Sequence, residues 1–308
     1  MFPYDNNKTY GIFVKEQIES LNKFCNNDVY FINAKIFGFL EYLRSIREIR
    51  ALVKDYDLIH CHHQFAGISY LFSFSFFNKK SILSILGDIK QRNFINKFCF
   101  YASYRFFDKV IFKNEIPFGN SSFVLLPNGV NPDFFKIIPQ FEARAKLNLS
   151  NDLIYVLFVS NGSLDNPIKR IDLFKGVVNL LNSSSKQYKF MPLFLSGVER
   201  DLVPYYYNAS NFMILSSDHE GSPNAVKEAM ATNLPVISTS VGDVHFLLNG
   251  VSNSYLSNEN TIESLYSLCL KLSYFNRSNG RDCIFLKGLD INTSSYLLFN
   301  QYKSCLNE

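Results

Sequence analysis

Apolar and polar positions form the clearest pattern in residues 212–243, where two apolar runs of strand length flank a helical repeat. The runs are 212–215 and 234–237, and the second is rich in β-branched residues. Between them, apolar residues recur at helical spacing, at Ala225, Val226, Ala229 and Met230. Strand, turn, helix and strand in this order predict a βαβ unit of a parallel sheet.

The turn before this helix carries the polar groups of the unit. Ser222 is predicted to cap the helix, and Pro223 suits its first position. Unpaired backbone N–H groups and the helix dipole make such an N-terminus an anion site. Glu220 and Glu228 bracket it, and a carboxylate beside an anion site needs a neutral partner, such as sugar hydroxyls. Taken alone, the two glutamates also fit an ordinary surface helix with solvated carboxylates.

The remainder of the chain alternates between predicted strands and predicted helices. Strands are expected at 29–32, 57–60, 81–86, 110–112, 122–125, 154–160 and 191–195. Helices are expected at 11–25, 39–54 and 94–107, with terminal helices within 279–302. This alternation predicts doubly wound α/β sheets.

Several segments together resemble family 4 of the retaining glycosyltransferases. They are EGSPN with KEAMA around Glu220 and Glu228, PNGVNPDFF at 127–135, and VGD at 241–243. The resemblance implies the GT-B fold, in which two Rossmann-like doubly wound domains face each other across a cleft. It implies an acceptor-side domain at 1–136, a nucleotide-sugar-binding domain at 137–285, and a terminal helix at 286–308 that crosses back to the first domain.

The N-terminal domain of that family opens with a buried central strand, and no apolar run supplies this first strand here. Residues 1–4 lead straight into the loop DNNKTYG. Burying such a strand of four large side chains stabilises a domain by about 6 to 12 kcal/mol. Either the true start lies upstream of Met1, or the protein lacks a core strand. We therefore expect the 308-residue chain to be poorly soluble or inactive, and a chain extended upstream to be stable.

The resemblance also assigns roles on the donor side. It implies that Glu220 holds donor-sugar hydroxyls as a catalytic residue and that Glu228 holds the ribose. Lys169 is implied as the second catalytic residue, on the diphosphate; a cation at a helix start opposes the helix dipole and so favours an anion. Many members carry an arginine a few residues earlier, near Ser163 in this chain, and Arg170 is expected to replace it. The remaining donor-binding residues implied are Gly11, Val198, Gly221, Ser222, Pro223, Asn224 and Gly242.

Histidines follow the predicted strand 57–60, at positions 60, 62 and 63. Side chains alternate along a strand and the sequence offers no obvious further ligands, so for at least one of these histidines a structural or surface role fits better than a metal ligand. The resemblance implies that His62 faces the reacting sugar as a catalytic residue. It places His60 and Asp88 on the acceptor side. No metal site is expected, because cations and helix ends hold the diphosphate in this family.

Composition and charge limit the expected binding partners and cellular location. The net charge of +4 is too small to argue for nucleic acid, but it is compatible with an anionic membrane face. Four cations, Arg44, Arg47, Arg50 and Lys54, share one side of the helix expected at 39–54. The six cysteines are scattered and indicate reduced thiols, and no stretch reaches the roughly 18 apolar residues of a membrane span. We expect a cytoplasmic protein with peripheral contact to the inner membrane face.

The expected activity is retaining transfer of a sugar from UDP-sugar or GDP-sugar to a hydroxyl of a glycan or lipid-linked glycan. Such enzymes build bacterial surface polysaccharides such as O-antigen and capsule. No cofactor and no metal are expected. Two alternatives remain, which are a GT-B sugar-nucleotide epimerase and a catalytically inactive GT-B partner protein.

Overall fold

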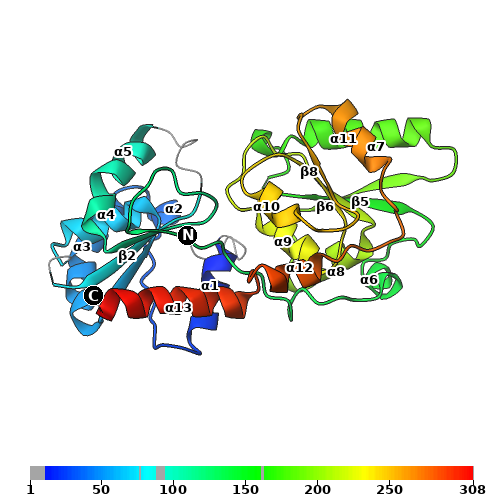
Figure 1. Cartoon of the computed structure of the whole chain (residues 1–308). Helices are drawn as coiled ribbons and strands as arrows, with labels where there is room; N and C mark the ends of the chain where they lie inside the picture. The colour runs from blue at the N-terminus through cyan, green and yellow to red at the C-terminus, as the bar shows by residue number, and fades with distance from the viewer. Residues whose placement is uncertain (1–10, 76–77, 88–93, 161–162, 308) are drawn as a thin grey trace. The chain divides into compact units, whose positions relative to one another are not determined.

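The computed structural model describes residues 11–75, 78–87, 94–160 and 163–307, and it divides into two compact units (Figure 1). The first unit comprises 11–128 and 292–307, and the second comprises 129–291. The division falls between Asn128 and Gly129, whereas the boundary expected from the sequence lies at 136. Each unit has its own parallel sheet, so the doubly wound two-domain architecture expected from the sequence is confirmed.

The first unit is built on a four-stranded parallel sheet in the order β1-β2-β3-β4. The strands are β1 (Leu58–His62), β2 (Lys80–Ile85), β3 (Lys109–Phe112) and β4 (Phe123–Leu125). Its helices are α1 (Ile12–Leu21), α2 (Ala34–Phe37), α3 (Glu41–Leu52), α4 (Gln64–Phe72), α5 (Phe94–Ser103) and α13 (Ile291–Asn307), with 3-10 turns η1 (Val53–Asp55) and η2 (Tyr104–Phe106).

Helices cover both faces of this sheet. On one face α4 packs between α3 and α5, and Leu83 and Val110 of the sheet join Phe100 in a core of aromatic residues. On the other face Ile82 and Ile111 pack against residues of α1 and α13. A parallel sheet buried on both sides explains why its strands read as continuous apolar runs rather than as alternating ones.

The strand expected at 29–32 is wrong, because the structure describes this segment without any sheet pairing. Val29 and Tyr30 are exposed, and the Tyr30 hydroxyl donates a hydrogen bond to Glu48. An apolar run becomes a strand only where a neighbouring strand completes its ladder of hydrogen bonds. The segment 1–4, where a first strand was sought, lies outside the described residues.

The second unit is built on a five-stranded parallel sheet in the order β6-β5-β7-β8-β9. The strands are β5 (Ile154–Val159), β6 (Phe190–Leu195), β7 (Phe212–Leu215), β8 (Val236–Thr239) and β9 (Tyr255–Ser257). The helices are α6 (Gln140–Lys146), α7 (Ile171–Ser184), α8 (Val203–Ala209), α9 (Asn224–Ala231), α10 (Val244–Leu248), α11 (Ile262–Cys269) and α12 (Gly280–Leu286), with turns η3 (Pro167–Lys169) and η4 (Arg200–Leu202).

The strand order of this second sheet reverses at β5. The chain passes from β5 to β6 on one side and then returns to β7 on the other side. At such a reversal the loops after the two neighbouring strands diverge, and they leave a crevice at the carboxyl ends of the strands where ligands bind. The loops that follow β5 and β7 therefore flank the expected binding edge of the second unit.

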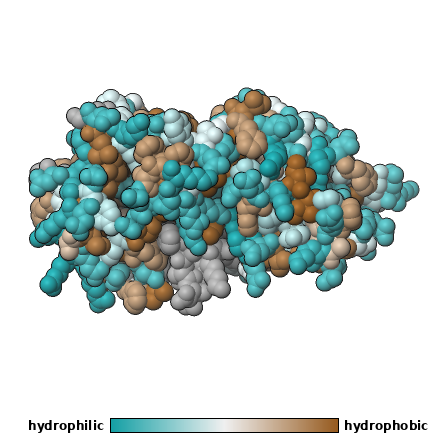
Figure 2. Space-filling view, turned by 90° about the horizontal axis from the view of Figure 1, so that it is seen from below, coloured by the Kyte–Doolittle hydropathy of each residue, from teal (hydrophilic) through white to brown (hydrophobic). Residues whose placement is uncertain are grey.

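The surface carries both hydrophilic and hydrophobic side chains. On the face shown in Figure 2, hydrophilic residues are mixed with hydrophobic residues that lie in small groups. None of the helices in the described part of the chain is long and apolar enough to cross a membrane.

Candidate functional site

An ion pair lies at the reversal of the second sheet. Lys169 ends the turn η3 after β5, and Glu220 lies in the loop between β7 and α9. The Lys169 Nζ atom is 2.6 Å from Oε1 of Glu220, and the two side chains are only 19% and 17% exposed. The Ser217 hydroxyl donates a second hydrogen bond of 2.8 Å to the same oxygen. The structure thus brings together the two residues that the sequence assigned to the diphosphate and to the sugar.

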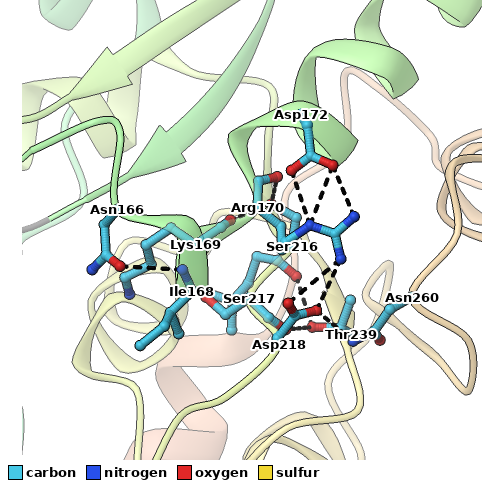
Figure 3. A network of polar contacts seen from close by, with 11 residues as sticks. Asn166, Ile168, Lys169, Arg170, Asp172, Ser216, Ser217, Asp218, Thr239 and Asn260 are labelled. Carbon is cyan, nitrogen blue, oxygen red and sulfur yellow. Dashed lines mark hydrogen bonds and ion pairs between the residues drawn. The ribbon is translucent and has the colours of Figure 1, made fainter.

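Backbone contacts fix the turn that carries Lys169. The Asn166 side chain accepts a hydrogen bond from the Ile168 N–H, which starts the turn (Figure 3). The Ser216 hydroxyl, at the end of β7, donates to the carbonyl oxygens of Lys169 and Arg170 at 2.9 and 3.0 Å. These bonds connect the ends of β5 and β7, so the position of Lys169 is set before any ligand arrives.

Arg170 is held by carboxylates on two sides (Figure 3). Its Nε and Nη2 atoms donate to the two oxygens of Asp172 at 2.9 and 2.8 Å, and Nη1 lies 3.1 Å from Asp218. Arg170 also has a positive φ of 49°, an uncommon conformation for a side chain with a Cβ atom. Its guanidinium would have to leave both carboxylates to bind a diphosphate, so the expected role as a substitute for the arginine near Ser163 stays a prediction.

The loop after β8 lies directly on the turn that contains Glu220. Gly242 has a φ of +53°, and a Cβ atom there would lie 1.9 Å from the carbonyl oxygen of Gly221. The next residue, Asp243, donates its backbone N–H to the same oxygen at 3.1 Å. Only glycine fits this approach, because any side chain at position 242 would displace the Glu220 turn. Gly221 and Gly242 are therefore brought together at the carboxyl edge of the sheet.

The helix α9 begins one residue later than predicted. Its N-cap is Pro223, and no side chain caps it, so the expected cap at Ser222 is wrong. The Ser222 hydroxyl instead accepts a hydrogen bond of 3.0 Å from the ammonium group of Lys227. Asn224, the first residue of the helix, is partly buried and has no hydrogen-bond partner for Oδ1 in the described part of the chain. Ser222 lies one residue before the N-cap position, and its hydroxyl contacts a side chain of α9 instead of a backbone N–H group.

Lys227 was missed by the sequence reasoning, and its side chain is fully buried. Burial lowers its pKa to about 8, against the opposing influence of the charges on Asp243 and Glu228. Burial likewise raises the pKa of the Asp243 carboxyl, and the charge of Lys227 lowers it. The available signal was the position of the lysine, which lies beside Val226 on the apolar side of the helical repeat. The charges of the two residues influence each other between α9 and the loop after β8, and no hydrogen-bond partner of the Asp243 carboxylate is found among the described residues.

Glu228 is held by two residues that the sequence reasoning also missed. The Tyr207 hydroxyl of α8 donates a short hydrogen bond of 2.6 Å to Oε2 of Glu228. Burial and the neighbouring carboxylate raise the pKa of the Tyr207 hydroxyl, so it remains a donor. The Arg200 guanidinium lies 3.7 Å from Oε1, and it also stacks 4.6 Å from the ring centre of Phe134. Glu228 is thus an oriented carboxylate rather than a solvated one.

The other donor-side candidates of the second unit occupy loops. Val198 follows Gly197, which has a φ of +64°, in the loop after β6, and it packs partly against the core. In the first unit, Gly11 has a φ of 67° and starts α1, where its carbonyl oxygen accepts from the backbone N–H groups of Val14 and Lys15. Asp88, expected on the acceptor side, lies outside the described residues. The donor roles of Val198 and Gly11 and the acceptor-side role of Asp88 stay predictions.

His60 and His62 lie on the same face of β1, and their rings stack 4.1 Å apart. The ring nitrogens of His60 are hydrogen-bonded to the hydroxyls of Tyr302 at 2.6 Å and Ser84 at 2.8 Å. Burial lowers the pKa of His62 to about 3, assisted by the charge of Lys113, and burial also places the pKa of His60 well below its usual range. Both imidazoles are therefore neutral at pH 7.

His62 differs from His60 in its hydrogen bonding. Its Nδ1 atom is buried and has no hydrogen-bond partner in the part of the chain that the structure describes. The residue after it, His63, caps α4 by accepting from the Phe65 N–H. Within the described ranges no group of three His, Cys, Asp or Glu residues could hold a metal ion. The role of His62 opposite the reacting sugar stays a prediction.

Comparison with known proteins supports the fold. Residues 191–273, which include the Glu220 turn, match the family described as glycosyl transferases group 1. No curated protein matches the sequence of the chain.

Solved structures match over most of the chain at low identity. A sucrose-phosphate synthase from Thermosynechococcus elongatus has a TM-score of 0.72 at 17% identity, over 96% of this chain and 93% of that chain. HepE of Anabaena, in complex with UDP-glucose, has a TM-score of 0.73 at 15% identity, over 96% of both chains. A glycosyltransferase from Rickettsia africae has a TM-score of 0.68 at 15% identity, over 95% and 87%. The chain therefore has the fold of the GT-B glycosyltransferases, and residues 191–273 of its second unit match the glycosyl transferases of group 1.

Proposed function

We propose that the chain is a retaining glycosyltransferase that moves a sugar from a UDP-sugar or GDP-sugar to a hydroxyl of a glycan or lipid-linked glycan. The observation that supports this most is the Lys169–Glu220 pair at the reversal of the second sheet. A cation for a diphosphate and an acceptor of hydroxyl hydrogen bonds stand side by side there, next to the N-terminus of α9. Glu228, oriented by Tyr207, would hold the ribose.

The proposed reaction breaks the bond between the sugar C1 atom and the diphosphate oxygen. The acceptor hydroxyl oxygen attacks C1 on the face from which the diphosphate leaves, and its proton passes to the departing phosphate oxygen. Negative charge grows on that phosphate, and Lys169 with the N–H groups at the start of α9 would stabilise it. Glu220 would orient the sugar through its hydroxyls. The proposal needs no metal ion, because these cationic groups take that role.

A role in surface polysaccharide synthesis is part of the proposal. This role rests on the family resemblance of the sequence. It includes peripheral contact with the inner membrane face, where a lipid-linked acceptor would be anchored. We propose His62 as a catalytic residue, Gly11 as a donor-binding residue, and His60 and Asp88 as acceptor-side residues.

Isothermal titration of UDP, GDP and their sugar conjugates tests the donor assignment. We expect Lys169→Ala to weaken nucleotide binding, because a charge-assisted contact contributes about 1.5 to 3 kcal/mol. Lys186→Ala, at an exposed lysine of the same unit, is the matched control and should bind as the wild type does. Equal nucleotide affinity in the Lys169→Ala and wild-type proteins would exclude the assignment.

The same nucleotide sugars also test the two alternative functions, which are a sugar-nucleotide epimerase and a catalytically inactive partner protein. An epimerase would convert the nucleotide sugar without any acceptor, which product analysis by chromatography detects. An inactive partner protein would bind no nucleotide sugar, and the pairing of Arg170 with Asp172 and Asp218 is the observation that favours it, since one expected diphosphate ligand is occupied.

A further inference from the structure

In the first unit, the start of α3 and the outward side of α5 carry exposed apolar side chains. α4 packs between the other two helices, and Gln64 at its start is hydrogen-bonded to Asn96 at the start of α5. The ring of Phe65 contacts that of Phe39, just before α3, at 5.5 Å between centres. The N-terminal ends of the three helices therefore adjoin each other, and Phe65 of α4 is half-buried at this end.

Large apolar side chains project from this surface into solvent. Phe94 is 80% exposed, Phe98 is 63% exposed and Phe39 is 61% exposed. Leu40, Leu43 and Ile95 are also exposed near the helix starts, as are Tyr101 later in α5, Phe37 in α2 and Phe72 at the end of α4. Water-exposed apolar patches of this kind mark a surface that contacts another apolar phase or a partner, because exposure of so many large side chains is otherwise unfavourable.

The charges around this surface indicate what kind of partner it binds. The sequences of α4 and α5 contain no aspartate and no glutamate. On α3 the exposed Arg44 and Arg47 share the outer side of the helix with Leu40 and Leu43, and at the end of α5 Arg105 is exposed. Glu41 pairs with Arg44 at 3.8 Å, and Glu48 accepts from the Tyr30 hydroxyl. The surface is therefore apolar at the helix starts and cationic beside them.

Not every cation of the basic face expected from the sequence is directed to this surface. The Arg50 Nε atom donates to the Ser73 carbonyl oxygen at 2.8 Å, and its guanidinium stacks 5.8 Å from the ring centre of Phe74. The cations of this helix would therefore bind an anionic membrane surface more weakly than the four cations expected from the sequence. Insertion of apolar side chains has to supply the rest of the binding free energy.

We propose that the α3–α4–α5 face docks the first unit on an anionic lipid bilayer, with Phe94 and Phe98 inserted among the acyl chains. Phenylalanine and leucine side chains gain free energy by leaving water at the interface, and arginines beside them pair with anionic headgroups. This inference deepens the proposed peripheral location by naming apolar insertion as its main component, and it does not depend on sugar transfer.

The chain contains no tryptophan, so a single introduced tryptophan reports on insertion directly. We expect the fluorescence of Phe94→Trp to shift to shorter wavelength with vesicles of phosphatidylcholine and phosphatidylglycerol, and to be quenched by brominated acyl chains. Phe275→Trp is the control, because Phe275 is a similarly exposed residue of the second unit. An unshifted Phe94→Trp spectrum, or the same shift in the control, would overturn the proposal.

Vesicle sedimentation gives the energetic test. Phe94→Ser with Phe98→Ser should lower the partition coefficient by about tenfold or more, since two large side chains lose their burial. The control pair, Phe275→Ser with Leu286→Ser, should bind as the wild type does. Unchanged binding of the first variant, with binding lost in Arg44→Gln with Arg47→Gln, would leave a purely electrostatic contact and refute insertion.

Two further readouts keep the outcome interpretable. Circular dichroism should show that the serine variants remain folded, because the replaced side chains are exposed. Nucleotide titration should be unchanged in them, which separates this inference from the proposed sugar transfer. If the wild-type protein does not bind the vesicles but forms dimers, and the Phe94→Ser and Phe98→Ser variant is monomeric, the surface binds a second copy of the chain and the proposal is refuted.

Discussion

Replacing Glu220 by glutamine should have opposite effects on nucleotide binding and on catalysis. In the structure without ligand, Glu220 holds the ammonium group of Lys169 at 2.6 Å. A nucleotide diphosphate must take Lys169 away from this carboxylate. Glu220→Gln keeps the shape of the side chain but removes its charge, so Lys169 becomes easier to recruit.

The magnitude follows from the attraction between the two charges of the pair. Glu220→Gln removes one of the two charges of the ion pair, and the ammonium group keeps a hydrogen bond to a neutral oxygen; the lost attraction between the charges of such a partly exposed pair is about 1 kcal/mol. The substitution therefore weakens the hold on Lys169 by about 1 kcal/mol, and UDP or GDP should bind roughly fivefold more tightly. Sugar transfer should fall by about 2 to 4 kcal/mol in transition-state stabilisation, mostly in kcat, because the sugar hydroxyls lose their charged acceptor.

Isothermal titration of the nucleotide without its sugar isolates the first effect, and transfer kinetics measure the second. The double variant Lys169→Ala with Glu220→Gln is the matched control, because the gain in affinity should disappear when the ammonium group is absent. Glu220→Gln with unchanged or weaker UDP and GDP binding would refute the competition. The same gain in the Lys169→Ala background would refute it as well. Full wild-type turnover in the single variant would remove Glu220 from the site.

Three other substitutions test the surroundings of this pair. Tyr207→Phe removes the hydrogen bond that orients the ribose-side carboxylate, and it should raise the KM for the nucleotide sugar about five- to tenfold, as steady-state kinetics can check. Lys227→Met should destabilise the fold by about 3 kcal/mol in urea unfolding, since it leaves the Asp243 carboxyl buried without its cation, and adding Asp243→Asn should recover most of that loss. The folded pKa of Lys227, about 8, lies below its usual value, so the unfolded state binds more protons and the contribution of Lys227 to wild-type stability should rise as the pH increases above 8. Gly242→Ala should abolish nucleotide binding detected by thermal shift, because its Cβ atom would displace the Gly221 carbonyl.

Local periodicity in the sequence was enough to find most of the elements that carry the site. The strand at 212–215 is β7 with the same bounds, and the helical repeat after it is α9. Both are buried elements whose apolar residues recur at the period of the structure they form. Glu220 and Lys169 were found because they are charged groups at strand-to-helix turns, where an unpaired backbone favours a ligand.

The tertiary structure decided which of these groups meet. Lys169 and Glu220 are 51 positions apart, and they form a pair because β7 lies beside β5 rather than beside β6. The sequence pattern reports which face of an element is buried, but it does not report the order of the strands. Tyr207 reaches Glu228 from α8, a helix that the sequence analysis did not predict.

In two segments, the apolar pattern of the sequence did not predict which residues are buried. Residues 29–32 have the composition of a strand, yet no described strand pairs with them, because a ladder needs a neighbour that composition does not specify. The helix α5 is rich in aromatic residues, yet of these only Phe100 is buried, whereas Phe94, Phe98 and Tyr101 are exposed. The sequence by itself determined that these segments are apolar, whereas the tertiary structure determined which of their side chains are buried, because burial depends on the neighbours that the fold places beside a segment.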